Sequence, residues 1–173
     1  MGADIIPAKP GKAPELITGA ALLVLTTTVP YLTLVNAFLF SGIVFSGAVA
    51  SYIYIIRHQI RLSYSEAFVL GAMSGFIGGA LSVLAGFLLE KLFGYRPGVE
   101  SIRLLVEWGS RVAPEEAATF RQMLATVTAP IEISLTDLVV SMLFTAMFYA
   151  PFSGLGGRLT VLILKRQAQR GAK

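Results

Sequence analysis

The chain has 173 residues, of which 55% are hydrophobic and only 14% are charged, whereas soluble domains carry about 25% charged residues. Its net charge is +4 and its pI about 9.6, but the basic residues lie at the ends of apolar runs and form no basic face interleaved with aromatic residues, which argues against nucleic-acid binding. The absence of cysteine excludes disulfides, thiolate metal sites and cysteine-based redox catalysis, and the mean hydropathy of +0.72 favours an integral membrane protein.

The N-terminal segment 1–14 is polar and Pro-rich and is expected to be a cytoplasmic tail. No charged residue occurs from Leu16 to Ile56, a run too long for one membrane crossing of about 20 residues. Pro30 and Asn36 are the residues able to interrupt it. The run is also longer than the core of a signal peptide, so the first helix is expected to remain in the protein. We therefore predict helices at 15–32 and 36–57.

Two capping boxes precede the next two apolar runs. Ser63 is followed three residues later by Glu66, and Ser134 by Asp137, the spacing at which a side chain and a backbone amide satisfy each other at a helix start. Further helices are therefore predicted at 65–93 and 135–166, followed by a basic cytoplasmic tail at 167–173.

The segment 94–133 between the last two predicted helices is polar but patterned. Apolar residues recur at helical spacing in two stretches, so we predict two short amphipathic helices within 98–128, resting on the membrane surface or capping the bundle. Pro114, followed by Glu115 and Glu116, is typical of a helix start. The two predicted apolar faces are Val99, Ile102, Leu105 and Val106, and Ala117, Phe120, Leu124 and Val127.

The distribution of Lys and Arg predicts the orientation. Four crossings would place both termini and the connection near 57–65 on one side, with eight basic residues, against five spread over the long segment on the other side. Both termini are therefore expected in the cytoplasm. The eight are Lys9, Lys12, Arg57, Arg61, Lys165, Arg166, Arg170 and Lys173, and the five are Lys91, Arg96, Arg103, Arg111 and Arg121. The expected fold is an all-α membrane protein, with four transmembrane helices in a domain at 15–166 and an extracytoplasmic amphipathic helical hairpin between the third and fourth.

Small residues recur every four positions along three of the predicted helices. In lipid, helices associate by close approach over such residues, because burial away from water no longer drives them together. The ridges either pack inside the bundle or face another chain, and both arrangements are compatible with the spacing. The predicted helix-packing residues are Gly42, Ser46, Gly71, Gly75, Gly78, Gly79 and Gly154.

A few residues are candidates for binding. Arg158 lies within the fourth predicted helix, where it either reaches the interface beside Lys165 or binds an anionic lipid, a substrate or a partner carboxylate. Phe120 and Trp108 in the outer segment are further candidates for lipid or partner contact. His58 is the only histidine and a weak candidate for a haem or chlorophyll ligand, although its basic surroundings favour an interface position.

Neither a catalytic constellation nor a metal cluster is predicted. Glu66, Glu90 and Asp137 lie near helix ends, and the first three predicted helices place no ionisable group at mid-membrane depth. Pro151 and Gly154-Leu155-Gly156-Gly157 instead predict a kink in the fourth helix or a close approach of another backbone, and the transporter alternative takes the same stretch as a break in this helix.

The chain resembles a group of small bacterial four-helix membrane proteins without an assigned function. Those proteins often carry cysteines near the first turn, where this chain has Phe38-Leu39-Phe40, so no role for such cysteines is carried over. The resemblance implies a fold and no catalytic residue. It rests on Pro30…Asn36, Ala50…Tyr54…Arg57, Glu66-Ala67…Leu70-Gly71-Ala72…Gly75…Gly78-Gly79 and Gly154-Leu155-Gly156-Gly157.

The leading interpretation is a structural or accessory subunit of a larger complex, such as a respiratory or photosynthetic one, in the bacterial cytoplasmic membrane. Its partners would be membrane lipids and other membrane subunits or a second copy of itself. The alternative is a small transporter or channel with a site near Arg158 and the broken fourth helix. An enzyme is not expected, and the sequence implies no particular cofactor, leaving a bound pigment or lipid open.

Overall fold

A computed structural model describes residues 11–36, 38–128 and 133–171, and the regular structure in these ranges is entirely helical. The predicted all-α class is therefore confirmed, while residues 1–10 of the predicted N-terminal tail lie outside the described residues. The elements are α1 (Ala13–Thr28), α2 (Pro30–Val35), α3 (Ser41–His58), α4 (Tyr64–Phe93), α5 (Pro97–Val112), the 3-10 helix η1 (Pro114–Glu116), α6 (Ala117–Thr128) and α7 (Leu135–Gly171).

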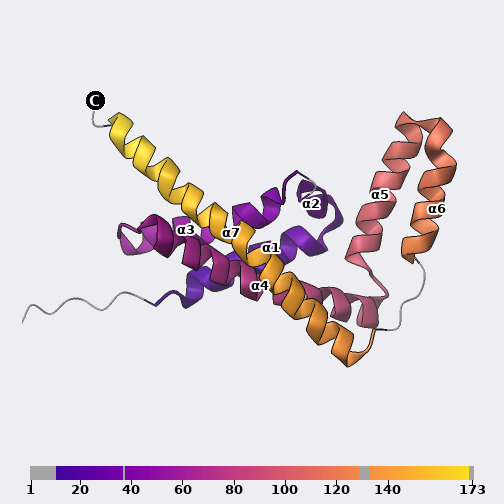
Figure 1. The fold of residues 1–173 in the computed structure, drawn as a ribbon, viewed down its shortest axis with the longest axis horizontal. Coiled ribbons are helices and arrows are strands. Elements are labelled where there is room, and N and C mark those ends of the chain that lie inside the picture. Colours follow the sequence, from indigo (N-terminus) through magenta and orange to yellow (C-terminus); the bar gives the residue numbers. More distant parts are fainter. Residues whose placement is uncertain (1–10, 37, 129–132, 172–173) are drawn as a thin grey trace, which may run out of the picture.

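The two longest helices, α4 and α7, cross each other at the centre of the molecule (Figure 1). They run in opposite directions, because Gly71 near the start of α4 lies against Ser153, whereas Gly79 lies against Ala146, earlier in α7. This crossing is the frame on which the other helices pack.

The two shorter apolar helices pack against this pair. α1 runs parallel to α4, since Gly19 faces Ser74 and, four residues later in both helices, Leu23 faces Gly78. α3 runs opposite to both and reaches α4 through the short connection 59–63. The start of α1, the end of α3, the start of α4 and the end of α7 therefore share one end of the bundle.

Within the described residues, α4 and α7 are the two helices long and apolar enough to cross a membrane by length and composition. Their most apolar 18-residue windows have mean hydropathies of 1.9 and 1.7. α1 is apolar but has only 16 residues, and α3 does not meet the same criterion. Four crossings therefore remain a prediction.

The first predicted helix, 15–32, ends too late. α1 stops at Thr28, because Val29 precedes a proline and takes an extended backbone with φ −87° and ψ 120°. Pro30 then occupies the first turn of α2 instead of lying inside α1. A proline in this run therefore begins a helix as well as ending one.

The second predicted helix, 36–57, starts too early. α3 begins at Ser41, because the two preceding residues have φ values of 53° and 56°, a left-handed backbone that a helix cannot include. Asn36 stabilises the turn from both sides. Its Nδ2 donates to the carbonyl oxygen of Thr26 at 3.0 Å, and its Oδ1 accepts from the backbone N–H of Ile43 at 3.2 Å.

Both predicted capping boxes are confirmed. The Ser63 hydroxyl accepts from the backbone N–H of Glu66 at 3.2 Å, while the Glu66 carboxylate accepts from the N–H of Ser63 at 2.9 Å. Ser134 and Asp137 make the corresponding two bonds, each at 3.1 Å. The starts of α4 and α7 are thus set by local chemistry.

α7 is longer and more regular than predicted. It continues to Gly171, so the described part of the predicted tail 167–173 is helical, because residues 167–170 are good helix formers. Pro151 lies inside α7, and the helix continues through the glycine-rich stretch after it. The predicted break is therefore wrong, whereas the close backbone approach is confirmed, because a Cβ on Gly156 would overlap the carbonyl oxygen of Val44 and one on Gly157 that of Ala67. Residues 172–173 lie outside the described residues.

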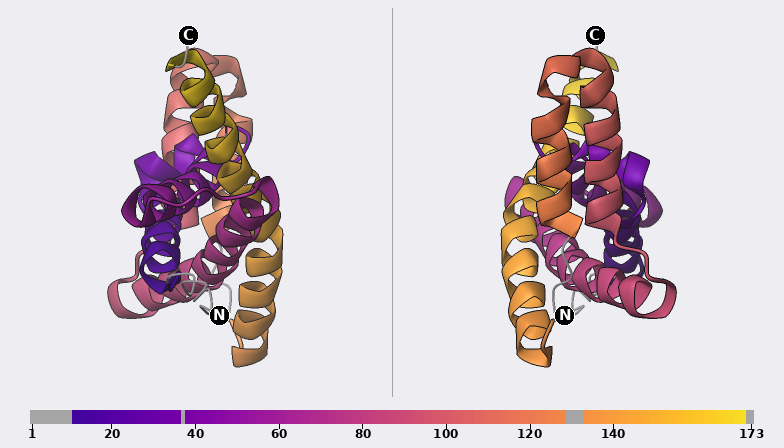
Figure 2. Two further views of the ribbon diagram at one scale, coloured as in Figure 1. Left: turned by 90° about the vertical axis from the view of Figure 1, so that its left-hand side faces the viewer. Right: turned by 90° about the vertical axis from the view of Figure 1, so that its right-hand side faces the viewer.

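The two predicted short helices within 98–128 are present as α5 and α6, which lie side by side (Figure 2) and stand away from the crossing of α4 and α7 (Figure 1). The ring of Phe120 lies 3.1 Å from the position that a Cβ on Gly109 would take, so the two helices meet there. Tyr95 fixes the base of this hairpin by donating from its hydroxyl to the carbonyl oxygen of Thr28 at 3.3 Å. Burial, assisted by the charge of Glu100, raises the pKa of the Tyr95 hydroxyl above its ordinary value.

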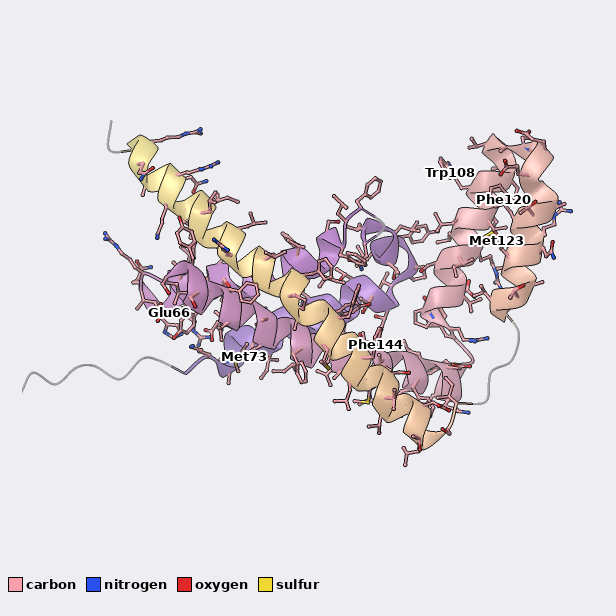
Figure 3. All side chains as sticks on the ribbon, viewed as in Figure 1. Glu66, Met73, Trp108, Phe120, Met123 and Phe144 are labelled. Carbon is pink, nitrogen blue, oxygen red and sulfur yellow. The ribbon has the colours of Figure 1, made fainter. Side chains whose placement is uncertain are left out.

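α4 and α7 bury mainly small residues, with Leu70, Leu138 and Val161 as larger exceptions, and expose many large apolar ones. Met73 and Phe144, for example, are 44% and 70% exposed and project outward (Figure 3). This is the reverse of the pattern in water-soluble cores, where large apolar side chains lie inside. The buried positions of α4 include Ala67, Gly71, Ser74, Gly75, Gly78, Gly79 and Ser82. The exposed ones of α4 and α7 include Val69, Phe76, Leu81, Leu88, Leu143, Met147, Leu155 and Ile163.

Candidate functional site

A buried carboxylate joins two helices at one end of the bundle. Glu15 lies in the first turn of α1, after Pro14, and its side chain is fully buried. The last turn of α3 supplies its partners: Arg57 Nη1 lies 3.5 Å and His58 Nε2 3.3 Å from Glu15 Oε1. The guanidinium is 59% exposed and the imidazole 22%, so the cluster is closed on the helix side and open toward the end of the bundle.

The surroundings of this carboxylate are mostly apolar. Leu16, Leu62 and Val161 belong to a buried cluster beside it, and the Tyr54 ring packs edge-on against His58 with 5.0 Å between centroids. Glu15 Oε2 is buried without a hydrogen-bond partner among the described residues. A charge in such a place is costly unless it is paired, so Glu15 depends on the two cationic or ionisable side chains of α3.

Sequence reasoning missed this cluster. Glu15 directly follows the N-terminal tail, and an acid in the first turn of a helix is ordinarily explained by the helix dipole. The available signal was that Glu15 comes after Lys12 and begins an apolar run whose partner helix ends in Arg57-His58. An acid and a base at the joined ends of two antiparallel apolar helices are expected to meet.

His58 was a weak candidate for a cofactor ligand. As placed, its Nε2 faces Glu15 and its ring lies against Tyr54. This geometry directs the histidine to an intramolecular pair, and no group of three or more His, Asp or Glu side chains among the described residues is arranged to hold a metal ion.

Basic and aromatic side chains gather at the same end. The Tyr64 ring, at the start of α4, lies under Lys165 Nζ at 4.1 Å and also 5.8 Å from Cζ of Arg158. A cation over a ring face is attracted by the ring quadrupole, so one tyrosine positions two α7 cations seven residues apart. Arg158 is exposed, which places it on the surface of α7 and not inside the bundle.

A cavity of about 360 Å³ opens beside these cations. It lies between the end of α3, the connection to α4 and the C-terminal part of α7. Arg61 and Lys165 lie at its rim with Gln169. The rest of the lining is apolar and consists of Ile55, Ile60, Leu62, Val161, Leu164 and Ala168.

The predicted helix-packing residues are all buried between helices of this chain. Gly71 and Gly75 face Ser153 of α7, and Gly79 faces Ala146. Gly78 faces α1, and the remaining three also meet residues of this chain. Gly42, Ser46, Gly71, Gly75, Gly78, Gly79 and Gly154 are all buried. The ridges are therefore occupied by internal contacts.

The two predicted contact residues of the hairpin have different positions. Phe120 packs between α5 and α6 against Gly109, whereas Trp108 is 66% exposed on the side of α5 away from α6 (Figure 3). Leu105 and Val112 share that side of α5 and are 46% and 65% exposed. The predicted apolar face of this helix is therefore wrong for Leu105, whereas its members Val99 and Val106 are buried. Trp108, and not Phe120, is therefore available to a partner.

Comparisons of the chain with protein-family models, with curated proteins and with solved structures give no match. The resemblance to small four-helix membrane proteins therefore stays a prediction.

Proposed function

We propose that this chain is a multi-pass membrane protein with four crossings, formed by α1 with α2, α3, α4 and α7, and that it serves as a non-catalytic accessory subunit of a larger membrane assembly. The observation that carries the membrane placement is the inverted burial of α4 and α7. Lipid tails are as apolar as leucine, so large apolar residues can face outward while small ones allow the helices to touch. In water, the same exposed surface would favour aggregation.

The charge difference between the two ends supports the proposed orientation. Eight of the described Lys, Arg and His side chains lie at the end that holds the start of α1. The carboxylates of Glu15 and Glu66 lie at the same end. At the hairpin end, acids and bases are nearly balanced. The excess of cations favours the cytoplasmic side for the first end. The eight side chains are Lys12, Arg57, His58, Arg61, Arg158, Lys165, Arg166 and Arg170.

The proposed docking surface is the side of α5 away from α6, formed by Leu105, Trp108 and Val112, and the proposed occupant is another membrane subunit. All three side chains are exposed, and Trp108 projects from α5 on the side opposite α6 (Figure 3). An exposed tryptophan flanked by aliphatic residues is typical of the centre of a protein interface. The internal glycine ridges leave this side as the best candidate for assembly.

The test is purification from native membranes in mild detergent with Trp108→Asp and with Glu107→Gln as the matched control on the same helix. Retention in the membrane fraction at alkaline pH tests the membrane placement separately. We expect both variants to stay in the membrane and only Trp108→Asp to lose a stoichiometric partner. A wild-type chain that purifies alone, or a partner retained by Trp108→Asp, would refute the docking surface.

The alternative of a transporter or channel depended on a broken fourth helix near Arg158. Because α7 is continuous and Arg158 is exposed, that observation no longer favours it.

A further inference from the structure

The cavity at the basic end has two chemically different parts. Six of its nine lining residues are apolar, and they come from α3, the connection to α4 and α7. The remaining three, Arg61, Lys165 and Gln169, are hydrogen-bond donors at the rim. Its volume of about 360 Å³ falls at the lower end of the range for small-molecule sites, roughly 300–1,000 Å³. An occupant must therefore be apolar in its body and polar at one end.

The positive charge of the rim favours an occupant whose polar end is negatively charged. Among the described residues that line the cavity there is no carboxylate. The two acids at this end of the bundle are committed elsewhere, because Glu15 is turned inward to Arg57 and His58, and Glu66 caps α4 through Ser63. The rim is therefore complementary to an anion.

One of the two rim cations, Lys165, is also held in place. Lys165 lies on the Tyr64 ring at 4.1 Å, and Arg158 approaches the same ring from the preceding turns of α7. Tyr64 itself is the first residue of α4, directly after the N-cap residue Ser63. Fewer rotamers are lost on binding when a cation is already positioned by a ring, which favours a specific site over diffuse attraction.

We infer that this cavity binds an anionic phospholipid of the cytoplasmic leaflet. Its phosphate lies between Arg61 and Lys165, and one acyl chain follows the apolar lining past Val161 and Leu164. The inference rests on the proposed membrane placement, which puts this end of the bundle at the level of the lipid headgroups. Basic pockets between helices at this level are suited to anionic headgroups.

The experiment is a binding titration of the purified full-length chain in neutral detergent, read by native mass spectrometry. The probes are dioleoyl-phosphatidylglycerol, dioleoyl-phosphatidylcholine and inorganic phosphate. We compare the wild type with Arg61→Gln/Lys165→Gln and with Arg166→Gln/Arg170→Gln, which removes the same charge from α7 outside the cavity. Circular dichroism verifies that each variant keeps its helices.

The anionic lipid should bind more tightly than the zwitterionic one. The rim variant should lose affinity on the order of fivefold for each cation removed, and the control should keep it. Ala168→Trp, which fills the apolar part without removing charge, should also weaken the anionic lipid. Equal losses in the two double variants, or equal affinity for the two lipids, would overturn the site. Competition by inorganic phosphate would mean a free-anion site and would overturn the lipid.

These results are independent of the membrane test. A chain that leaves the membrane at alkaline pH contradicts the placement, whereas a chain that stays in the membrane but shows no lipid preference contradicts the lipid site alone.

Discussion

Oε1 of Glu15 lies 3.3 Å from Nε2 of His58, and this pair joins the first turn of α1 to the last residue of α3. The two residues are 43 positions apart in the chain. Together with the Arg57–Glu15 pair, this contact joins the start of α1 to the end of α3. Because the carboxylate is fully buried and the imidazole is not, loss of a partner costs more free energy for Glu15 than for His58.

Replacing His58 with alanine should destabilise the wild-type chain more than it destabilises a chain in which Glu15 is already replaced with glutamine. His58→Ala leaves the buried carboxylate with the more distant Arg57, which should cost about 1–3 kcal/mol. In the Glu15→Gln background the same change should cost much less, since no buried carboxylate then loses a partner. The measurement is a double-mutant cycle on thermal unfolding in detergent. Additive effects would show that the two side chains are not coupled.

The packing of the helices should tolerate a methyl group at one glycine and not at another. A Cβ on Gly156 would overlap the carbonyl oxygen of Val44, which is backbone and cannot rotate away, so Gly156→Ala should lower stability by more than about 2 kcal/mol. A Cβ on Gly86 meets nothing within 4 Å, and Gly86→Ala should be neutral or stabilise α4 by up to about 1 kcal/mol.

The measurement is the midpoint of thermal unfolding for both variants in the same detergent. Equal destabilisation by the two substitutions would contradict the distinction between packed and unpacked glycines. Gly75→Leu should disrupt the bundle further, because its Cβ would already lie 2.5 Å from that of Ser153.

The proposed orientation predicts opposite signals from two reporter fusions. A reporter after residue 173 should be cytoplasmic, and one inserted within 108–113 should be outside. The physical reason is the excess of cations at the end of the bundle that includes the C-terminal part of α7. Identical signals at both positions would mean that the chain does not cross the membrane once between the insertion and the C-terminus. The assignment of α7 as a crossing would then be wrong.

The hairpin should depend on Phe120. Phe120→Ala removes the ring that lies on Gly109, and the loss should be on the order of 1–2 kcal/mol, below the value for a fully buried phenylalanine because this one is half-buried. Hydrogen exchange in the membrane-bound chain measures the opening of 98–128. Arg121→Gln, one residue later and exposed, is the control. A segment unprotected even in the wild type would mean that the hairpin does not form stably.

Local chemistry alone determined the helical class and two helix starts of this protein. The capping boxes at Ser63 and Ser134 act within four residues, and the half-buried side of α6 follows from apolar residues at helical spacing. The end of α1 at Val29 is also set locally, by the proline that follows it. The sequence pointed to both Pro30 and Asn36 as interruptions, and only the structure shows that Pro30 begins α2 while Asn36 hydrogen-bonds across the turn.

Tertiary structure alone decided which residues form a site. Glu15 became a buried partner of His58, and Lys165 and Arg61 became the rim of a cavity, because packing brought together helix ends far apart in the sequence. It also decided that the glycine ridges face inward, since periodicity gives the side of a helix on which small residues lie but not the helix that covers it.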